Sequence, residues 1–226
     1  MTPHPTNNHT IGVLMLETKF PRPVGDVGHP MTFSNLGLKA IYQVLPGASP
    51  MRVVSPNDPG LLQAFIAAAH ELVAQGATLI TTSCGFLARY QAAMSEALPV
   101  PVITSSLLLC ATLPKPIVLT INASSLSPEL LQAAGVPEGT PVIGVPPESH
   151  FRQQILGNQP TLNPVQAQAE LVALVKNLKA SHPEAQSLVL ECTNMPPYAE
   201  ALARASSLPV HHLMTAIADY TQNHPA

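Results

Sequence analysis

The sequence predicts an α/β fold with two pseudo-symmetric lobes, each a parallel sheet flanked by helices, and an active site between them. Short apolar runs recur along the 226 residues, and most are continuous, as in strands buried on both faces of a parallel sheet. Segments with helical spacing separate these runs, an alternation typical of parallel α/β folds. A stretch near residue 80 also recurs near residue 190, which indicates two related halves.

Seven apolar runs have the length and composition of strands. The first follows a polar stretch of ten residues, and the last directly precedes a cysteine. In chain order the predicted strands are IGVLMLE (11–17), MRVV (51–54), ATLITT (77–82), VPVIT (100–104), PIVLTI (116–121), PVIGV (141–145) and SLVLE (187–191).

The clearest predicted helix begins at Asp58 and Pro59, a favourable N-cap and N1 pair, and ends before Gly76, a natural C′ residue. Its apolar side chains recur at helical spacing and form one face. That face consists of Leu62, Phe65, Ile66, Ala69, Leu72 and Val73.

Three more helices are predicted further along the chain. One opens with Ser127 and Pro128 and closes at Gly135, and another covers Thr215 to Tyr220. The helix between them carries its apolar residues at Val165, Ala169, Val172, Leu174 and Leu178.

The repeat pairs LITTSCGFLARYQAAMSEALPVPVITS with LVLECTNMPPYAEALARASSLPVHHLMT. Each copy has an apolar strand, a cysteine, an aromatic residue six positions later and the tripeptide LPV. We therefore expect a first lobe of residues 1–104 plus about 211–226, and a second lobe of residues 105–210. The last segment is assigned to the first lobe because that lobe otherwise lacks a closing element.

The repeat places Cys84 and Cys192 at the carboxyl ends of equivalent strands, where open α/β sheets bind ligands. A cysteine at the first turn of a helix faces unpaired N–H groups and the positive end of the helix dipole, which favour the thiolate. The same N–H groups can hold a carboxylate. Two facing cysteines predict a two-base site, in which one removes a proton from carbon and the other supplies one. Cys110 lacks this setting and is expected in the core, the usual place of a free cysteine.

Composition and missing motifs exclude several other classes. A net charge of -3 gives no footprint for nucleic acid, and no basic run or long apolar segment suggests a membrane. Three cysteines form no secretory disulfide framework, and the N-terminus does not read as a signal peptide, so a cytoplasmic protein is expected. Nucleotide, metal and CxxC motifs are missing, so neither a metal nor a cofactor is expected. His211 and His212 are adjacent in a predicted strand, so at most one can face the site.

These motifs resemble the aspartate/glutamate racemase superfamily, which includes amino-acid and hydantoin racemases, maleate isomerase and arylmalonate decarboxylase. The resemblance covers almost the whole chain. It is carried by IGVLMLE as first strand, the loop VGDVGHPMTF, the site SCGF, the segment IVLTINASSLSPELLQAAGV and the site ECTNMPPY. Members need no cofactor and use one cysteine from each half, which implies catalytic roles for Cys84 and Cys192.

The resemblance also implies a set of ligand-binding residues. Residues beside the cysteines hold the substrate carboxylate in the family, the loop after the first strand closes over the ligand, and the strand that opens the second half faces it. In this sequence the corresponding residues are Ser83, Gly85, Phe86, Thr193, Asn194, Thr32, Asp26, Thr120 and Asn122.

Two departures affect the substrate. The first site has Ser-Cys-Gly-Phe where amino-acid racemases commonly show Cys-Asn-Thr, and Phe86 suits a less polar substrate. Glu191 places a carboxylate beside the second cysteine, where it either raises the pKa of that thiol or points away.

The leading hypothesis is a cofactor-independent racemase or isomerase acting at the carbon next to the carboxylate of a small amino acid or related acid. The alternatives are an arylmalonate-type decarboxylase or lyase, a maleate isomerase-like enzyme, and a catalytically silent protein that binds small carboxylates. A small carboxylate is the expected partner, and a homo-oligomer is left open.

Overall fold

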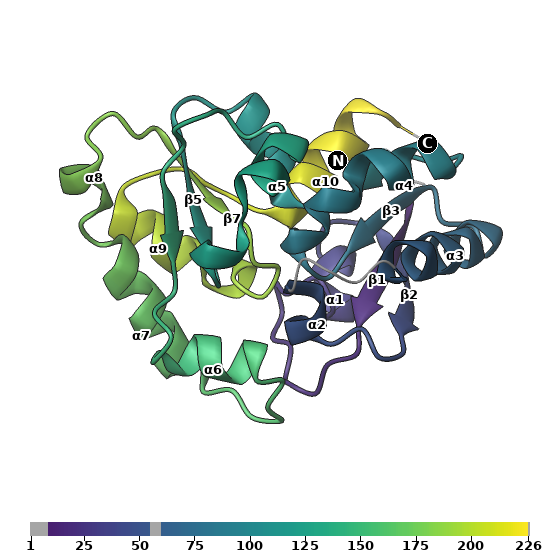
Figure 1. Cartoon of the computed structure of the whole chain (residues 1–226), viewed down its shortest axis with the longest axis horizontal. Coiled ribbons are helices and arrows are strands. Elements are labelled where there is room, and N and C mark those ends of the chain that lie inside the picture. Colours follow the sequence, from purple (N-terminus) through teal and green to yellow (C-terminus); the bar gives the residue numbers. More distant parts are fainter. Residues whose placement is uncertain (1–8, 55–59, 226) are drawn as a thin grey trace, which may run out of the picture.

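Two four-stranded parallel sheets, each flanked by helices, form the core of the protein in a computed structural model that describes residues 9–54 and 60–225. Figure 1 shows the two lobes side by side, with the first sheet near α3 and the second near α7 and α9. The predicted fold class is therefore confirmed. No helix in the described ranges combines the length and apolar character that crossing a bilayer requires.

The first sheet contains strands from the first half of the chain, in the order β2-β1-β3-β4. β1 lies in the interior of the sheet and is almost entirely buried, which explains its continuous apolar run. The strands are β1 (Thr10–Leu16), β2 (Lys39–Leu45), β3 (Leu79–Thr82) and β4 (Val102–Ile103).

The second sheet repeats this topology in the order β6-β5-β7-β8. In each sheet the third strand along the chain pairs with the first, so β3 lies beside β1 and β7 lies beside β5. The strands are β5 (Pro116–Thr120), β6 (Val142–Gly144), β7 (Ser187–Leu190) and β8 (Val210–His211). The boundaries between the lobes at residues 104 and 210 stay a prediction.

One predicted strand is wrong. Residues 51–54 belong to a short helix, α2 (Pro50–Val54), and the strand that pairs with β1 is β2 instead. Pro50 suits the first position of a helix, and Val53 and Val54 are buried together. β2 escaped prediction because it is an edge strand that mixes polar and apolar residues and is only partly buried.

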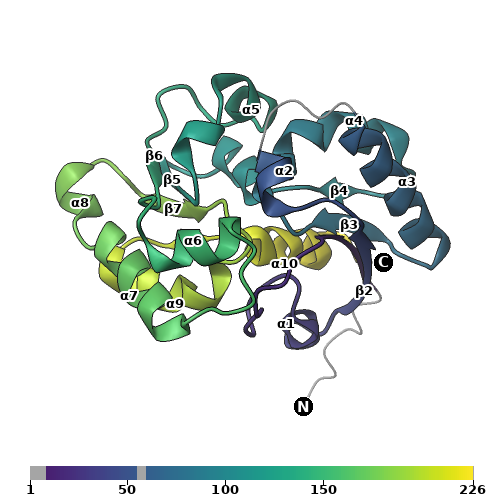
Figure 2. The ribbon, with the colours of Figure 1, turned by 60° about the horizontal axis from the view of Figure 1, so that its bottom comes forward.

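Helices cover both faces of the first sheet. α3 (Leu61–Ala74) packs Phe65 against Leu14, and Gly76 follows it with a φ of +98°, as expected for a C′ glycine. The predicted start of this helix at Asp58 and Pro59 lies outside the described residues. α10 (Leu213–Asn223) follows the last strand of the second sheet yet packs against the other face of the first, beside α1 (Pro30–Ser34). Figure 2 shows α10 between the lobes. The remaining helix of this lobe is α4 (Gln91–Ala97).

The second sheet is covered by five α-helices in the described residues. Ser127 caps the first of them by accepting a hydrogen bond from the N–H of Leu130, as its sequence predicts. The helices are α5 (Pro128–Ala133), α6 (His150–Leu156), α7 (Pro164–Val175), α8 (Leu178–Ser181) and α9 (Ala199–Ser206).

The predicted apolar face of α7 is wrong. Val165 is 77% exposed and Ala169 is exposed, while the buried residues of this helix are Ala167, Leu171 and Val175. The helix also ends before Leu178, which belongs to α8. The buried residues recur every four positions, as expected for one face of a helix. The prediction chose another face because it counted Val165, at the start of the helix, as a buried residue.

Candidate active site

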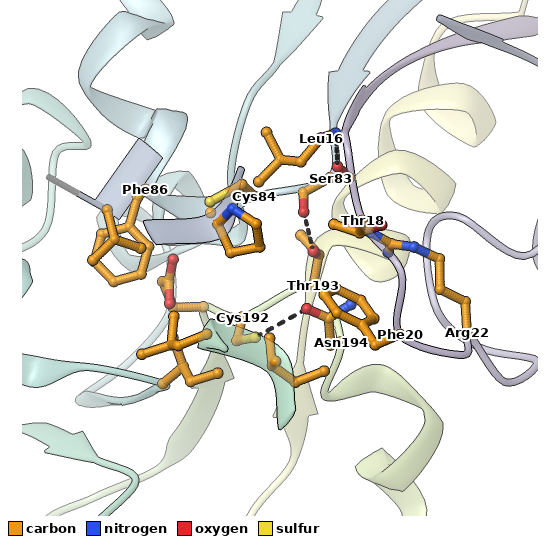
Figure 3. A pocket seen from close by; sticks show the side chains of 17 residues that line it. Leu16, Thr18, Phe20, Arg22, Ser83, Cys84, Phe86, Cys192, Thr193 and Asn194 are labelled. Atoms are coloured by element: carbon orange, nitrogen blue, oxygen red, sulfur yellow. Dashed lines mark hydrogen bonds between the residues drawn. The ribbon is translucent and has the colours of Figure 1, made fainter. Parts of the chain in front are cut away.

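A single hollow lies where the carboxyl ends of β3 and β7 meet, and both Cys84 and Cys192 line it. Its empty volume is about 350 Å³, a figure that includes the open solvent at its mouth. Figure 3 shows the two cysteines on opposite walls. The lining residues are Leu16, Thr18, Phe20, Arg22, Pro50, Val54, Ser83, Cys84, Gly85, Phe86, Ile121, Ile155, Leu156, Glu191, Cys192, Thr193 and Asn194.

The first cysteine is positioned by the end of β3. The N–H of Ser83 donates to the carbonyl of Leu14 at 2.9 Å, and its hydroxyl accepts from the N–H of Leu16 at 2.8 Å. Cys84 then caps the six-residue 3₁₀ helix Gly85–Tyr90 with extended backbone angles. The strand end is therefore locked to β1, and the thiol is only partly exposed.

Two hydrogen bonds hold the strand ends at the site, one across the lobes and one from the segment that follows β4. The hydroxyl of Thr193 donates to the carbonyl of Ser83 at 2.7 Å, and the hydroxyl of Ser106 donates to the carbonyl of Leu190 at 2.6 Å. Both are buried, where an unpaired polar group would be costly. The carboxyl ends of the two strands are held in a fixed relation, which keeps the two thiols on facing walls.

The second cysteine belongs to a chain of polar contacts. Its Sγ donates to Oδ1 of Asn194 at 3.6 Å, and Nδ2 of Asn194 donates to Oδ2 of Asp26 at 2.6 Å. The other oxygen of Asp26 accepts from Arg22 at 2.6 Å and from the N–H of Gly28 at 2.7 Å. A buried carboxylate from the first lobe thus orients the amide beside Cys192.

The loop after β1 supplies residues that the sequence analysis missed. Arg22 donates to Thr18 at 3.0 Å, and its guanidinium carbon lies 4.8 Å from the centre of the Phe20 ring. All three lie on the same side of the hollow in Figure 3. The family resemblance pointed to this loop, but to its later part, around Asp26.

Four predicted ligand-binding residues do not line the hollow. Asp26 holds Asn194, and the hydroxyl of Thr32 donates to the carbonyl of Asp26 at 2.7 Å. Thr120 donates to Oε2 of Glu191 at 2.7 Å, and Asn122 is bonded to Ser125, Ser124 and Arg152. The other predicted residues, Ser83, Gly85, Phe86, Thr193 and Asn194, line the hollow together with both cysteines.

Glu191 faces inward and is fully buried, with a relative exposure of 0%. Its Oε2 is bonded by Thr120, and its Oε1 has no hydrogen-bond partner among the described residues. Burial raises the pKa of this carboxyl to about 7, although the Thr120 bond and the charge of Arg89 act in the opposite direction.

The expectation that a helix N-terminus lowers the thiol pKa values is wrong. Burial raises the pKa of Cys84 to about 12, the nearby charge of Glu191 raises it further, and the N–H of Phe86 only partly compensates. The same two causes raise the pKa of Cys192 well above its ordinary value. Neither thiol precedes an α-helix directly, because short 3₁₀ turns follow both strands, so loss of water outweighs the backbone N–H groups.

The remaining candidates lie elsewhere. Cys110 is fully buried in an apolar core, as predicted, and burial raises its pKa to about 12. His212 caps α10 and forms a capping box with Thr215, and neither it nor His211 lines the hollow.

Sequence comparison with known proteins finds dimethylsulfoniopropionate lyases. No family model matches the chain. Dimethylsulfoniopropionate lyase 6 of Emiliania huxleyi (strain CCMP1516) is 32% identical over 222 residues, 91% of this chain and 57% of the relative. Dimethylsulfoniopropionate lyase 5 of the same organism is 28% identical over 92% of this chain and 44% of the relative. A dimethylsulfoniopropionate lyase of Durusdinium sp. clade D is 27% identical over 89% and 70%. The chain spans about half the length of the first two.

Solved structures share the fold across nearly the whole chain. A sulfate-associated mutant of arylmalonate decarboxylase has a TM-score of 0.62 at 18% identity, covering 96% of this chain and 94% of its own. Allantoin racemase from Pseudomonas fluorescens has a TM-score of 0.61 at 16% identity, covering 95% and 89%. Aspartate racemase of Picrophilus torridus has a TM-score of 0.56 at 12% identity, covering 95% and 93%. The chain has the fold of the Asp/Glu/hydantoin racemase superfamily.

Proposed function

We propose that this protein is a cofactor-independent enzyme that removes a proton from the carbon next to the carboxylate of a small acid. Cys84 and Cys192 are its acid–base groups. One observation carries the proposal: two thiols from equivalent positions in two lobes line opposite walls of the same hollow. A structural cysteine has no reason to recur in matched positions around a shared cavity.

The site suits the removal of a weakly acidic proton. A thiolate whose pKa is raised by burial is a stronger base than an ordinary thiolate, and a thiol in the same setting keeps its proton. The backbone N–H groups of Phe86 and Asn194 act on the sulfurs and face the same hollow as the hydroxyl of Thr193. These groups are the donors that we assign to the substrate carboxylate.

The two thiols have unlike surroundings, which assigns their roles. Cys192 uses its S–H as a donor to Asn194, so its proton is held in place, whereas Cys84 is partly exposed. In the proposed reaction Cys84, as thiolate, takes the proton from carbon. Cys192 stands on the other side as the acid.

We favour elimination as the fate of the resulting carbanion, on the basis of the sequence relatives. In a sulfonium-substituted propionate, the Cα–H bond breaks as Cys84 takes the proton. The electron pair forms a carbon–carbon double bond, and the bond from Cβ to sulfur breaks. The products are acrylate, dimethyl sulfide and a protonated thiol, which returns its proton to water. The dimethylsulfoniopropionate lyases that match 89–92% of this chain are named for such a substrate.

Racemisation is the second candidate, and the presence of both thiols favours it. If Cys192 protonates the carbanion from its own side, the carbon is inverted and no bond to a leaving group breaks. Elimination needs only the base.

The test is a reaction in D₂O followed by proton NMR. The protein is incubated with dimethylsulfoniopropionate and, separately, with single enantiomers of small amino acids and hydantoins. Vinyl protons of acrylate support elimination, and loss of the α-proton signal without vinyl protons supports racemisation. A protein that produces neither signal with any of these acids is a binder, and the proposal is then wrong.

A further inference from the structure

Glu191 is a buried carboxyl group that the proton transfer does not use. Its side chain lines the hollow, its exposure is 0%, and Oε1 has no hydrogen-bond partner in the described part of the chain. An ionised carboxylate without a partner is costly to bury, so such a group points to something that binds against it.

The place of Glu191 is set by Gly85 on the opposite lobe. A Cβ atom on Gly85 would lie 2.2 Å from the carbonyl oxygen of Glu191 and 2.4 Å from its Oε1. The free oxygen therefore touches the backbone next to Cys84, while Glu191 itself directly precedes Cys192. Because Gly85 has no side chain, the Glu191 carboxyl group can occupy this position; a larger residue at position 85 would collide with it.

The charged groups around Glu191 do not neutralise it by a direct ion pair that involves Oε1. Arg89 acts on it through space and donates its own Nε to the carbonyl of Phe86 at 3.1 Å. The two thiols also line the hollow, and the Glu191 charge raises their pKa values. Arg22 lines it too, but its guanidinium is paired with Asp26. The hollow that must accept an anionic substrate thus also holds the Glu191 carboxyl group.

We propose that Glu191 is the cation-recognition residue of this site, so that the substrate is a zwitterion with a positive group beside its carboxylate. The inference rests on the proposed function, because it concerns the acid that binds in the same hollow. A cation against Oε1 supplies the missing partner and offsets the repulsion between Glu191 and the substrate carboxylate. It also opposes the effect of Glu191 on the thiols, so that a bound substrate favours the thiolate that its own reaction needs.

Two classes of cation fit this description, sulfonium and ammonium. The hollow is largely lined by apolar side chains, with Phe86 and Ile121 among them, which suits a cation that carries methyl groups. A simple ammonium instead needs several hydrogen-bond acceptors.

Matched pairs of acids separate recognition of charge from recognition of shape. 4-Methylpentanoate has the shape of dimethylsulfoniopropionate with carbon in place of the charged sulfur, and isobutyrate stands in the same relation to alanine. Dissociation constants are measured by calorimetry at pH 8 in a Cys84→Ser background, which prevents turnover, with and without Glu191→Gln.

With Glu191 present, we expect the cationic acid of one pair to bind at least about 30-fold more tightly than its neutral partner. In Glu191→Gln the preference falls below about 3-fold, because the amide keeps the shape but loses the charge. The pair that shows the effect identifies sulfonium or ammonium. Binding without a preference for the cation, or a preference that survives Glu191→Gln, overturns the role of Glu191 and leaves the proposed function standing. If none of the four acids binds, both proposals fail.

A second test keeps Glu191 and varies the pH, so that it does not depend on correct folding of the Glu191→Gln variant. As the pH falls from 8 to 6, Glu191 takes up a proton, so the preference for the cation should fall with a midpoint near the pKa of about 7. A preference that is constant over this range contradicts the proposal.

Discussion

The amide nitrogen of Asn194 donates a hydrogen bond to Oδ2 of Asp26 at 2.6 Å, and this bond joins the loop after β1 to the turn that carries Cys192. Because Asp26 also accepts from Arg22 and Gly28, its carboxylate is fully engaged and buried. The amide of Asn194 can therefore present only its oxygen to the Cys192 thiol.

The first prediction concerns this contact. Asp26→Ala removes the carboxylate that pairs with the Arg22 guanidinium and leaves the buried amide nitrogen of Asn194 without its acceptor, so the free energy of unfolding should fall by about 3 kcal/mol. Urea unfolding measures the loss. Glu200→Ala, which breaks the exposed Arg204–Glu200 pair, is the control and should cost under about 0.5 kcal/mol. Equal effects of the two variants would contradict the buried role of Asp26.

The second prediction concerns the two thiols. Because Cys84 is assigned as the base, Cys84→Ser should lower acrylate formation by about 10³-fold, and Cys192→Ser by no more than about 10-fold. Cys110→Ala is the control and should keep wild-type activity, because Cys110 lies in the core. A racemase gives another pattern: each serine variant loses inversion, yet still exchanges the α-proton of one enantiomer. Near-normal turnover of both serine variants is incompatible with either reaction.

The third prediction concerns thiol reactivity. The pKa of Cys84 is raised to about 12, so the thiolate fraction at neutral pH is very small and grows tenfold with each pH unit. Labelling by iodoacetamide, followed by mass spectrometry, should show a Cys84 rate that climbs about tenfold per unit between pH 7 and 9. Cys110 should stay unlabelled in the folded protein. A plateau in the Cys84 rate below pH 8 would show a lowered pKa instead.

The fourth prediction concerns stability and pH. The pKa of Glu191 is raised from 4.5 to about 7, so the folded protein holds this proton more tightly than the unfolded chain does. The resulting stabilisation is complete below pH 4.5 and is lost as the pH rises through 7. The glutamine of Glu191→Gln cannot titrate, so this variant does not lose that stabilisation. Between pH 4.5 and pH 8 the free energy of unfolding of the variant should therefore rise by about 3 kcal/mol relative to that of the wild type. A difference that stays flat over this range would mean that folding does not raise the pKa of Glu191.

The sequence alone predicted those elements of the fold that depend on neighbouring residues in the chain. The cap at Ser127, the terminating Gly76 and the strands buried in the sheets follow from residue type and spacing, and so does the matched position of the two cysteines. The edge strand β2 and the helix α2 were misjudged because their burial depends on neighbours distant in the sequence.

The candidate site was also predicted only in part. Its cysteines could be predicted, but the sign of their pKa shifts could not, because burial and the inward orientation of Glu191 arise only when the lobes meet. Asp26 was placed near the substrate, whereas its contacts make it a support for Asn194. Arg22, Thr18 and Phe20 carry no motif of their own and become neighbours only through the path of the loop.

The return of α10 to the first sheet has a consequence for how the protein is made. On the ribosome the strands of the first sheet, residues 10–103, emerge first, but Ile11, Val13 and Leu79 pack against Leu213 and Ile217. The strands of the second sheet, residues 116–211, are complete before α10 leaves the exit tunnel. Domains tend to fold as they emerge, so the half that is synthesised first is finished last. The apolar face of the first sheet that α10 covers therefore stays exposed while more than a hundred further residues are translated.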